Sequence, residues 1–84
     1  MQTYIARIKV TLRKSILDPQ GKAVHHALES LNLNMVENVR VGKFIEMTLK
    51  ADSKEDAERL AELACNKLLA NPVMEDYAFQ IENS

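Results

Sequence analysis

The sequence has little of what extracellular proteins and stand-alone enzymes depend on. Its 84 residues include one cysteine, no tryptophan and only 5% aromatic residues. A single cysteine, Cys65, forms no internal disulfide, so a reducing, cytoplasmic location is expected. A chain of this length also has little room for a deep substrate pocket, and so few aromatic side chains could not line a large apolar ligand cage. An enzyme working alone is therefore disfavoured.

Neither sign of charge is in excess, and long apolar runs are missing. The chain has 11 Lys and Arg residues against 12 Asp and Glu, a formal net charge of −1. This balance argues against a nucleic-acid-binding protein that acts through positive charge. The longest apolar runs span only a few residues, so no membrane span is predicted. The first residues do not have the pattern of a secretory signal.

What the sequence does contain is alternation. In residues 3–14 apolar side chains fall on one face and most of the charged ones on the other. This period of two predicts a long strand with one solvated face. The apolar face comprises Tyr4, Ala6, Ile8, Val10 and Leu12. Residues 73–81 alternate in the same way and predict a last strand.

Residues 36–50 also alternate, and they allow two interpretations. Gly42 and Lys43 could form the two-residue turn of a hairpin. The apolar side chains keep the same phase on both sides of Gly42, however. Unbroken phase favours one long strand that is bent or bulged at this glycine. The bent strand is the preferred interpretation, and the hairpin stays open as the alternative.

A first helix is predicted from about Pro19 to Asn32. Asp18 is suited to cap its N-terminus, and proline is tolerated at the first helical position. Its apolar stripe consists of Val24, Ala27, Leu28 and Leu31. Gly21 lies in the first turn, where glycine costs up to about 1 kcal/mol relative to alanine. That cost suggests a close approach by the backbone of another element or by a ligand.

A second helix begins at Asp52 or Ser53, either of which can cap it, and ends before Asn71 and Pro72. Its inner stripe is made mostly of small residues, which let a helix lie close to a sheet. The stripe comprises Ala57, Leu60, Ala61, Ala64, Cys65 and Leu68.

The order strand, helix, strand, helix, strand predicts one α+β domain over residues 1–84. We expect a small, twisted, mostly antiparallel sheet with a long central strand bent near Gly42 and two helices on one face. Two strands joined by a helix run parallel under the crossover rule, with a third strand, from this chain or a partner, between them. Long exposed strand edges predict a homodimer or a larger homo-oligomer.

No group of residues has the spacing of a catalytic, cofactor or metal site. His25 and His26 diverge by about 100° on a helix, so they cannot ligate one metal as an i, i+4 pair. Cys65 lies on the inner stripe and is interpreted as a core residue rather than a nucleophile. The common nucleotide-binding and metalloprotease motifs do not occur.

The charged side chains are most simply solvated. The acids of the second helix are interpreted as its wet face. They are Glu55, Asp56, Glu58 and Glu62. Arg40, Lys43 and Lys50 could together bind an anion, but protection of a strand edge is the favoured interpretation.

Three short stretches punctuate the elements and occur in a fixed order. L-D-P-Q-G begins at Leu17, V-R-V-G-K begins at Val39, and K-L-L-A-N-P-V-M-E-D-Y begins at Lys67. The candidate interface or structural residues in these stretches are Asp18, Pro19, Gln20, Gly21, Arg40, Gly42, Lys43, Asn71, Pro72, Glu75, Asp76 and Tyr77. In order and spacing the three stretches resemble the PurS-type small subunit of phosphoribosylformylglycinamidine synthase, over nearly the whole chain. Residues 32–35, Asn-Leu-Asn-Met, depart from the glycine expected after the first helix of that family.

The resemblance implies a subunit of a three-part complex in purine synthesis. In that family a glutaminase subunit releases ammonia, and a large subunit uses ATP and Mg²⁺ to convert formylglycinamide ribonucleotide to the amidine. The small subunit is expected to bind no cofactor itself and to carry no catalytic residues. It would associate with itself and bridge the other two subunits, with no nucleic acid and no membrane involved.

Other functions remain open from the residues alone. The chief alternative is a regulatory module that senses an amino acid at a dimer interface, because Asp18-Pro19-Gln20-Gly21 follows a first strand. A nucleic-acid-binding sandwich and a stand-alone enzyme rank lower.

Overall fold

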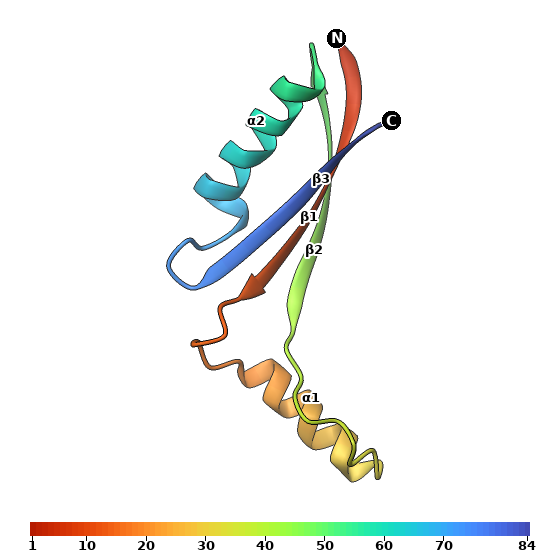
Figure 1. Ribbon diagram of the computed structural model, residues 1–84, viewed down its shortest axis with the longest axis vertical. Helices are drawn as coiled ribbons and strands as arrows, with labels where there is room; N and C mark the ends of the chain where they lie inside the picture. Colours follow the sequence, from red (N-terminus) through yellow and green to blue (C-terminus); the bar gives the residue numbers. More distant parts are fainter.

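A computed structural model describes all residues, 1–84, as six elements in chain order (Figure 1). The strands are β1 (Gln2–Leu12), β2 (Gly42–Ala51) and β3 (Glu75–Asn83), and the helices are α1 (Pro19–Ser30) and α2 (Lys54–Ala64). A π-helical turn, η1 (Cys65–Leu69), continues α2. None of the helices is long and apolar enough to cross a membrane.

The sheet has three strands in the order β2-β1-β3, and β1 is antiparallel to both neighbours. Ile8 of β1 lies opposite Ile45 of β2 and Phe79 of β3. The predicted α+β class with an antiparallel sheet is confirmed. The strand of residues 36–50 was expected in the centre, and this is wrong, because β1 holds that place and β2 forms an edge.

The crossover rule holds for one helical connection and fails for the other. Strands β2 and β3 are parallel to each other, joined by α2, with β1 between them. Strands β1 and β2 are also joined by a helix, but they are antiparallel neighbours. The reason is that α1 lies past the end of the sheet instead of crossing its face, so the chain returns beside β1 in the opposite direction (Figure 1).

Strand β2 begins at Gly42, and residues 36–41 are irregular. The hairpin alternative is therefore wrong. The preferred interpretation is also wrong in part, because Gly42 is the first residue of the strand and not a bend within it. The N–H of Val41 donates to the Asp18 carboxylate at 2.8 Å, so it does not join the ladder to β1. The phase beyond Gly42 is as predicted, with Ile45, Met47 and Leu49 packed against the core.

The core lies between the sheet and α2. Its strand side is the predicted apolar face of β1, of which Tyr4, Ala6, Ile8 and Val10 are buried. Its helix side consists of small residues that let α2 approach closely. They are Ala57, Ala61 and Cys65. The prediction is wrong for Leu60 and Leu68 of the same stripe, which are exposed. Of the two candidate caps, Ser53 is the one used, because its hydroxyl accepts from the N–H of Asp56 at 3.2 Å.

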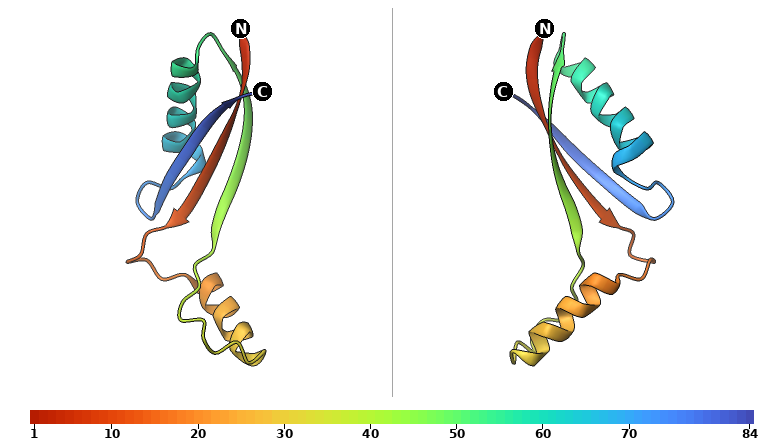
Figure 2. Two further views of the ribbon diagram at one scale, coloured as in Figure 1. Left: turned by 45° about the vertical axis from the view of Figure 1, so that its right-hand side comes forward. Right: turned by 180° about the vertical axis from the view of Figure 1, so that it is seen from behind.

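Only α2 packs on the sheet, so the expectation of two helices on one face is wrong for α1. Helix α1 and the irregular residues beside it extend beyond the sheet, which makes the molecule 52 Å long but only 14 Å thick (Figure 2). The apolar stripe of α1 is left open, with Val24 42% and Leu31 68% exposed. Periodicity predicted this stripe correctly, but it could not say what the stripe would meet.

Candidate functional site

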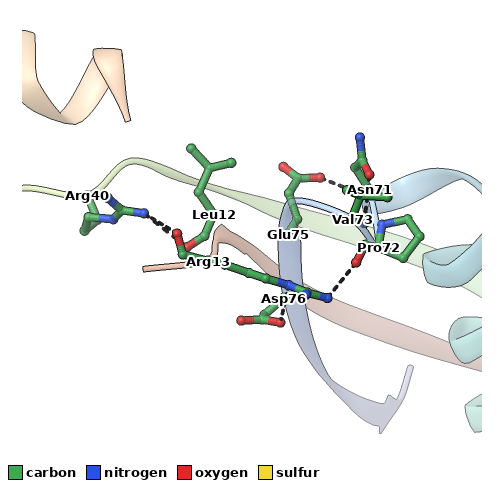
Figure 3. A network of polar contacts seen from close by, with 8 residues as sticks. All are labelled: Leu12, Arg13, Arg40, Asn71, Pro72, Val73, Glu75 and Asp76. Carbon is green, nitrogen blue, oxygen red and sulfur yellow. Dashed lines mark hydrogen bonds and ion pairs between the residues drawn. The ribbon is translucent and has the colours of Figure 1, made fainter. Parts of the chain in front are cut away.

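The three punctuating stretches meet where the sheet ends and α1 begins. We call this place the junction and define it as residues 12–21, 39–43 and 71–76. It joins the body of the molecule, formed by the sheet and α2, to the segment that carries α1. Figure 3 shows part of the network of polar contacts within the junction.

Asp18 holds the start of α1 and the approach to β2 together. One carboxylate oxygen accepts from the N–H of Gly21 at 2.9 Å and the other from the N–H of Val41 at 2.8 Å. These bonds hold the pKa of the Asp18 carboxyl below its ordinary value of 3.8, with help from the Arg40 charge and against the effect of burial. The carboxylate is therefore ionised at neutral pH and serves as an N-cap and a cross-link at once.

Gly21 is required by a close approach of the backbone. A Cβ placed on this residue would lie 2.3 Å from the carbonyl oxygen of Val39 and 2.9 Å from the Asp18 carboxylate. The expectation that another element comes near Gly21 is confirmed. The neighbour is the irregular segment before β2, which packs directly on the first turn of α1.

Arg40 satisfies backbone carbonyls that follow β1. Its guanidinium donates to the carbonyl oxygens of Arg13 at 2.8 Å and Ile16 at 3.2 Å, with a longer contact of 3.4 Å to that of Leu12. Figure 3 shows Arg40 reaching toward the backbone at Leu12 and Arg13. The exposed guanidinium is thus engaged by backbone carbonyls of its own chain, and it does not form an anion site with Lys50.

Arg13 links the junction to the turn before β3. Its side chain donates to the carbonyl oxygen of Pro72 at 2.6 Å and lies 3.3 Å from the Asp76 carboxylate, while its own N–H donates to the carbonyl of Met74 at 2.9 Å (Figure 3). Sequence reasoning missed this role, because Arg13 was expected only on the solvated face of a strand. No local signal identifies its partners, which lie some sixty residues away.

The turn before β3 is closed by its own side chains. The Asn71 amide oxygen accepts from the N–H of Val73 at 3.0 Å, and the Glu75 carboxylate accepts from the N–H of Asn71 at 2.7 Å. Lys43 of β2 lies 3.6 Å from Glu75. The strand therefore begins at Glu75, two residues later than predicted, because residues 71–74 form the turn.

The remaining candidates are placed around this network. Pro19 is the first residue of α1, and Gln20 lines a hollow of about 120 Å³ together with Gly42 and Lys43. Gly42 does not have a positive φ, but a Cβ there would lie 2.7 Å from the Val10 carbonyl oxygen. Its need for glycine therefore comes from crowding.

Tyr77 stands apart from the junction and faces α2. Its hydroxyl donates to the Glu62 carboxylate at 2.6 Å. This bond raises the pKa of Tyr77 to about 12, because ionisation would remove the bond and place a second negative charge beside Glu62. The pair fastens β3 to α2.

The Tyr77 contact predicts a pH effect. A raised pKa means that the neutral hydroxyl stabilises the folded chain fully below the ordinary value of 10, and that this contribution is lost as the pH rises toward about 12. In Glu62→Gln the pKa of Tyr77 should move back toward 10, which ultraviolet titration of the phenolate measures. Glu58→Gln removes an exposed neighbouring charge and should leave this titration unchanged. Equal titrations in the two variants would contradict the contact.

Cys65 and His25, two of the side chains that sequence reasoning weighed for chemistry, are placed as structural residues. Burial raises the pKa of the Cys65 thiol, with a smaller effect from Glu62, and a protonated, buried thiol is a poor nucleophile. His25 Nε2 lies 2.8 Å from the carbonyl oxygen of Val36. No group of three or more His, Cys, Asp or Glu side chains is arranged to hold a metal ion. The role of the junction contacts described above is therefore structural: they fix the position of α1 relative to the sheet.

Fold and junction together define a class of small α+β chains with a three-stranded antiparallel sheet, one covering helix and a second helix beyond the sheet. The family model described as "PurS: Phosphoribosylformylglycinamidine (FGAM) synthase" matches residues 5–83. A relative from Bacillus subtilis, phosphoribosylformylglycinamidine synthase subunit PurS, is 47% identical over 94% of this chain and 93% of its own length. The chain therefore belongs to the PurS family.

Solved structures agree with the whole chain. B. subtilis PurS, 46% identical, superimposes with a TM-score of 0.86 over 95% of this chain and 99% of that chain. PurS of Methanocaldococcus jannaschii is one of the subunits of formylglycinamide ribonucleotide amidotransferase in the purine biosynthetic pathway, and its TM-score is 0.85 at 34% identity over 96% and 98% of the two chains. A chain in the structure of PurLQS from Thermotoga maritima reaches 0.89 at 32% identity, over 98% and 100%. The resemblance found in the three stretches is confirmed.

Proposed function

We propose that this chain is the non-catalytic small subunit of phosphoribosylformylglycinamidine synthase, which acts in purine biosynthesis. In this role it bridges a glutaminase subunit and a large ATP-dependent synthetase subunit, and it helps ammonia pass between them. Residues 1–84 act as one domain, and the proposed location is the cytoplasm. The similarity to a chain of the T. maritima PurLQS structure supports the partner set.

The observation that supports the non-catalytic role is that polar side chains in the three stretches are bonded to this chain's own backbone. The Asp18 carboxylate, the Arg40 guanidinium and the Asn71 amide all contact backbone groups of this chain. Groups engaged in this way position a segment and are not free to move protons or bind a substrate. The loop from Asp18 to Gly21, which suggested an amino-acid sensor, is likewise occupied by Val39 and Val41. We assign ATP and Mg²⁺ to the large subunit alone.

Physical chemistry supports a bridging subunit in such a complex. Ammonia is a nucleophile only as the free base, and in bulk water at neutral pH most of it is protonated. A chain that closes the contact between the site of ammonia release and the site of its use would limit this loss. The long, thin shape of the molecule and its balanced charge suit a chain that lies between two larger proteins. Self-association as a homodimer or larger is part of the same proposal.

Reconstitution with the two partner subunits tests the proposal. Adding this chain to the glutaminase and synthetase subunits should restore amidine formation from glutamine, with a smaller effect when an ammonium salt replaces glutamine. The chain by itself should turn over neither substrate. Equal glutamine-dependent activity with and without the chain would contradict the bridging role, and turnover by the chain alone would contradict its non-catalytic role.

A further inference from the structure

A hollow beside α1 gathers basic side chains from two segments. The irregular residues before β2 run alongside α1 (Figures 1 and 2), and the space between them and the helix has a volume of about 220 Å³. Lys22 and His25 of α1 line this space, and Arg40 and Asn38 line it from the other segment. We call these four residues the basic hollow. They concentrate positive charge on a chain whose formal net charge is −1.

No carboxylate forms an ion pair with the basic hollow. Every other arginine of the chain has a carboxylate oxygen within 3.3 Å, whereas Arg40 lies in none of the ion pairs. Lys22 and His25 lie in none either. Asp18 is the one acid that lines the space, but it is buried, its oxygens accept from backbone N–H groups, and its single charge offsets at most one of the cations. Positive charge left in this way attracts anions.

The donors that line the basic hollow suit the oxygens of a phosphate group, which carries roughly two negative charges near neutral pH. The Lys22 ammonium and the Asn38 amide both donate through N–H groups. His25 Nε2 lies 2.8 Å from the carbonyl oxygen of Val36, and because a carbonyl oxygen only accepts, Nε2 carries a proton. Nδ1 is therefore left for a ligand, and it donates when the ring is charged. The Arg40 guanidinium is held by the backbone carbonyls after β1, so it supplies a fixed positive charge.

The site differs from a helix N-terminus and from the anion site considered in the sequence. The N–H of Gly21 in the first turn of α1 is already bonded to Asp18, so a ligand in the basic hollow is bound by side chains. Arg40 was weighed as an anion ligand with Lys43 and Lys50, and the fold instead places it beside two residues of α1. The volume is below the range of about 300–1,000 Å³ that is typical of sites for whole small molecules, and this suits a single phosphate group.

We propose that the basic hollow binds phosphate, either as the free ion or as the phosphate group of a small ester. Such a ligand contacts α1 and the segment before β2 at once. It ties the helix more firmly to the junction, because a ligand stabilises the conformation that binds it. This inference goes beyond the proposed function and does not depend on it, since the whole site lies within one chain.

Titration of the whole chain with inorganic phosphate at constant ionic strength, followed by NMR shifts of the backbone amides, tests the site. The amides of residues 22–25 and 38–40 should shift along saturable curves with one common Kd. Lys22→Gln should raise this Kd about fivefold or more, because it removes a charged donor, while glutamine has nearly the helix propensity of lysine. Lys9→Gln is the matched control. Lys9 is also exposed and lies in no ion pair, so this variant loses the same charge on β1 and should keep the Kd within about twofold.

The choice of ligand and the control variant decide the outcome. A lower Kd for ribose 5-phosphate than for inorganic phosphate would assign the basic hollow to an ester, and the reverse order would assign it to the free ion. Shifts that do not saturate, or equal weakening by Lys22→Gln and Lys9→Gln, would mean that phosphate only screens surface charge, and the inference would be wrong. None of these results bears on the reconstitution experiment, so the phosphate site and the bridging role are tested separately.

Discussion

Replacement of Ile8 by alanine is expected to lower the free energy of unfolding by about 2–5 kcal/mol, the usual cost of truncating a buried aliphatic side chain. Ile8 is fully buried at the middle of β1 and lies between Ile45 and Phe79 on the neighbouring strands. Backbone ladders on both sides keep β1 from moving into the space left by the missing atoms. A chain of 84 residues has a total stability of roughly 4–13 kcal/mol, so this single change removes a large share of it.

Ile5→Ala is the matched control for this effect. Ile5 is on the same strand and has the same side chain, but it is half-buried on the face that α2 does not cover. Its truncation should cost less than half as much as that of Ile8. Denaturant titration of both variants measures the difference, and equal losses would mean that the core does not lie on the α2 side of the sheet.

Replacement of Gly21 by alanine is expected to loosen α1 from the rest of the molecule. Helix propensity alone predicts a gain of about 1 kcal/mol from this change. The new Cβ, however, would lie 2.3 Å from the backbone oxygen of Val39, and overpacking of this kind costs about 1–3 kcal/mol. Because the obstacle is backbone, it cannot be relieved by a side-chain rotation, so residues 36–41 must shift and the bond from Val41 to Asp18 must lengthen.

The loss should be local, since α1 contributes little to the main core. Hydrogen exchange at the amides of α1 and of Val41 should therefore accelerate about tenfold or more, while the amides of β1 change little. Lys22→Ala, at the exposed neighbouring position, introduces the same residue without the contact. Lysine is already a good helix former, so the gain in propensity is small, and exchange should change little. Slower exchange in Gly21→Ala would show that propensity outweighs the contact.

Patterns that depend on near neighbours in the chain were predictable from the sequence. The apolar face of β1, the cap of α1 at Asp18 and the small residues of α2 all follow from local spacing, and each is confirmed. The three stretches also contain many of the residues that form the junction, although Arg13 lies outside them. The residues of the three stretches have structural roles in common, because turns and helix caps use particular residue types at particular positions.

Features that depend on distant segments were not predictable in the same way. The strand order could not be predicted, because it depends on β1 pairing on both of its edges. An alternating pattern shows that a segment is a strand, but it does not show how many neighbours that strand has. The position of α1 could not be predicted either, because it depends on two contacts between distant segments. Val39 occupies the space over Gly21, and Arg40 binds the carbonyls after β1. The role of Arg13 follows only once the turn at Pro72 lies beside it. A periodic stripe shows that a helix has an apolar side, but it does not identify the surface that covers it.

The central position of β1 has a consequence for how the chain is made. Strand β1 is synthesised before both of its neighbours, since β2 comes after α1 and β3 includes residues 75–83. Until α2 is synthesised, the apolar side of the nascent strand has no helix over it, and until residues 75–83 follow, one of its edges has no partner. Contacts between segments so far apart close slowly, and exposed strands of this kind are prone to aggregate. Production of the protein should therefore depend on translation speed and on chaperones that shield a nascent chain.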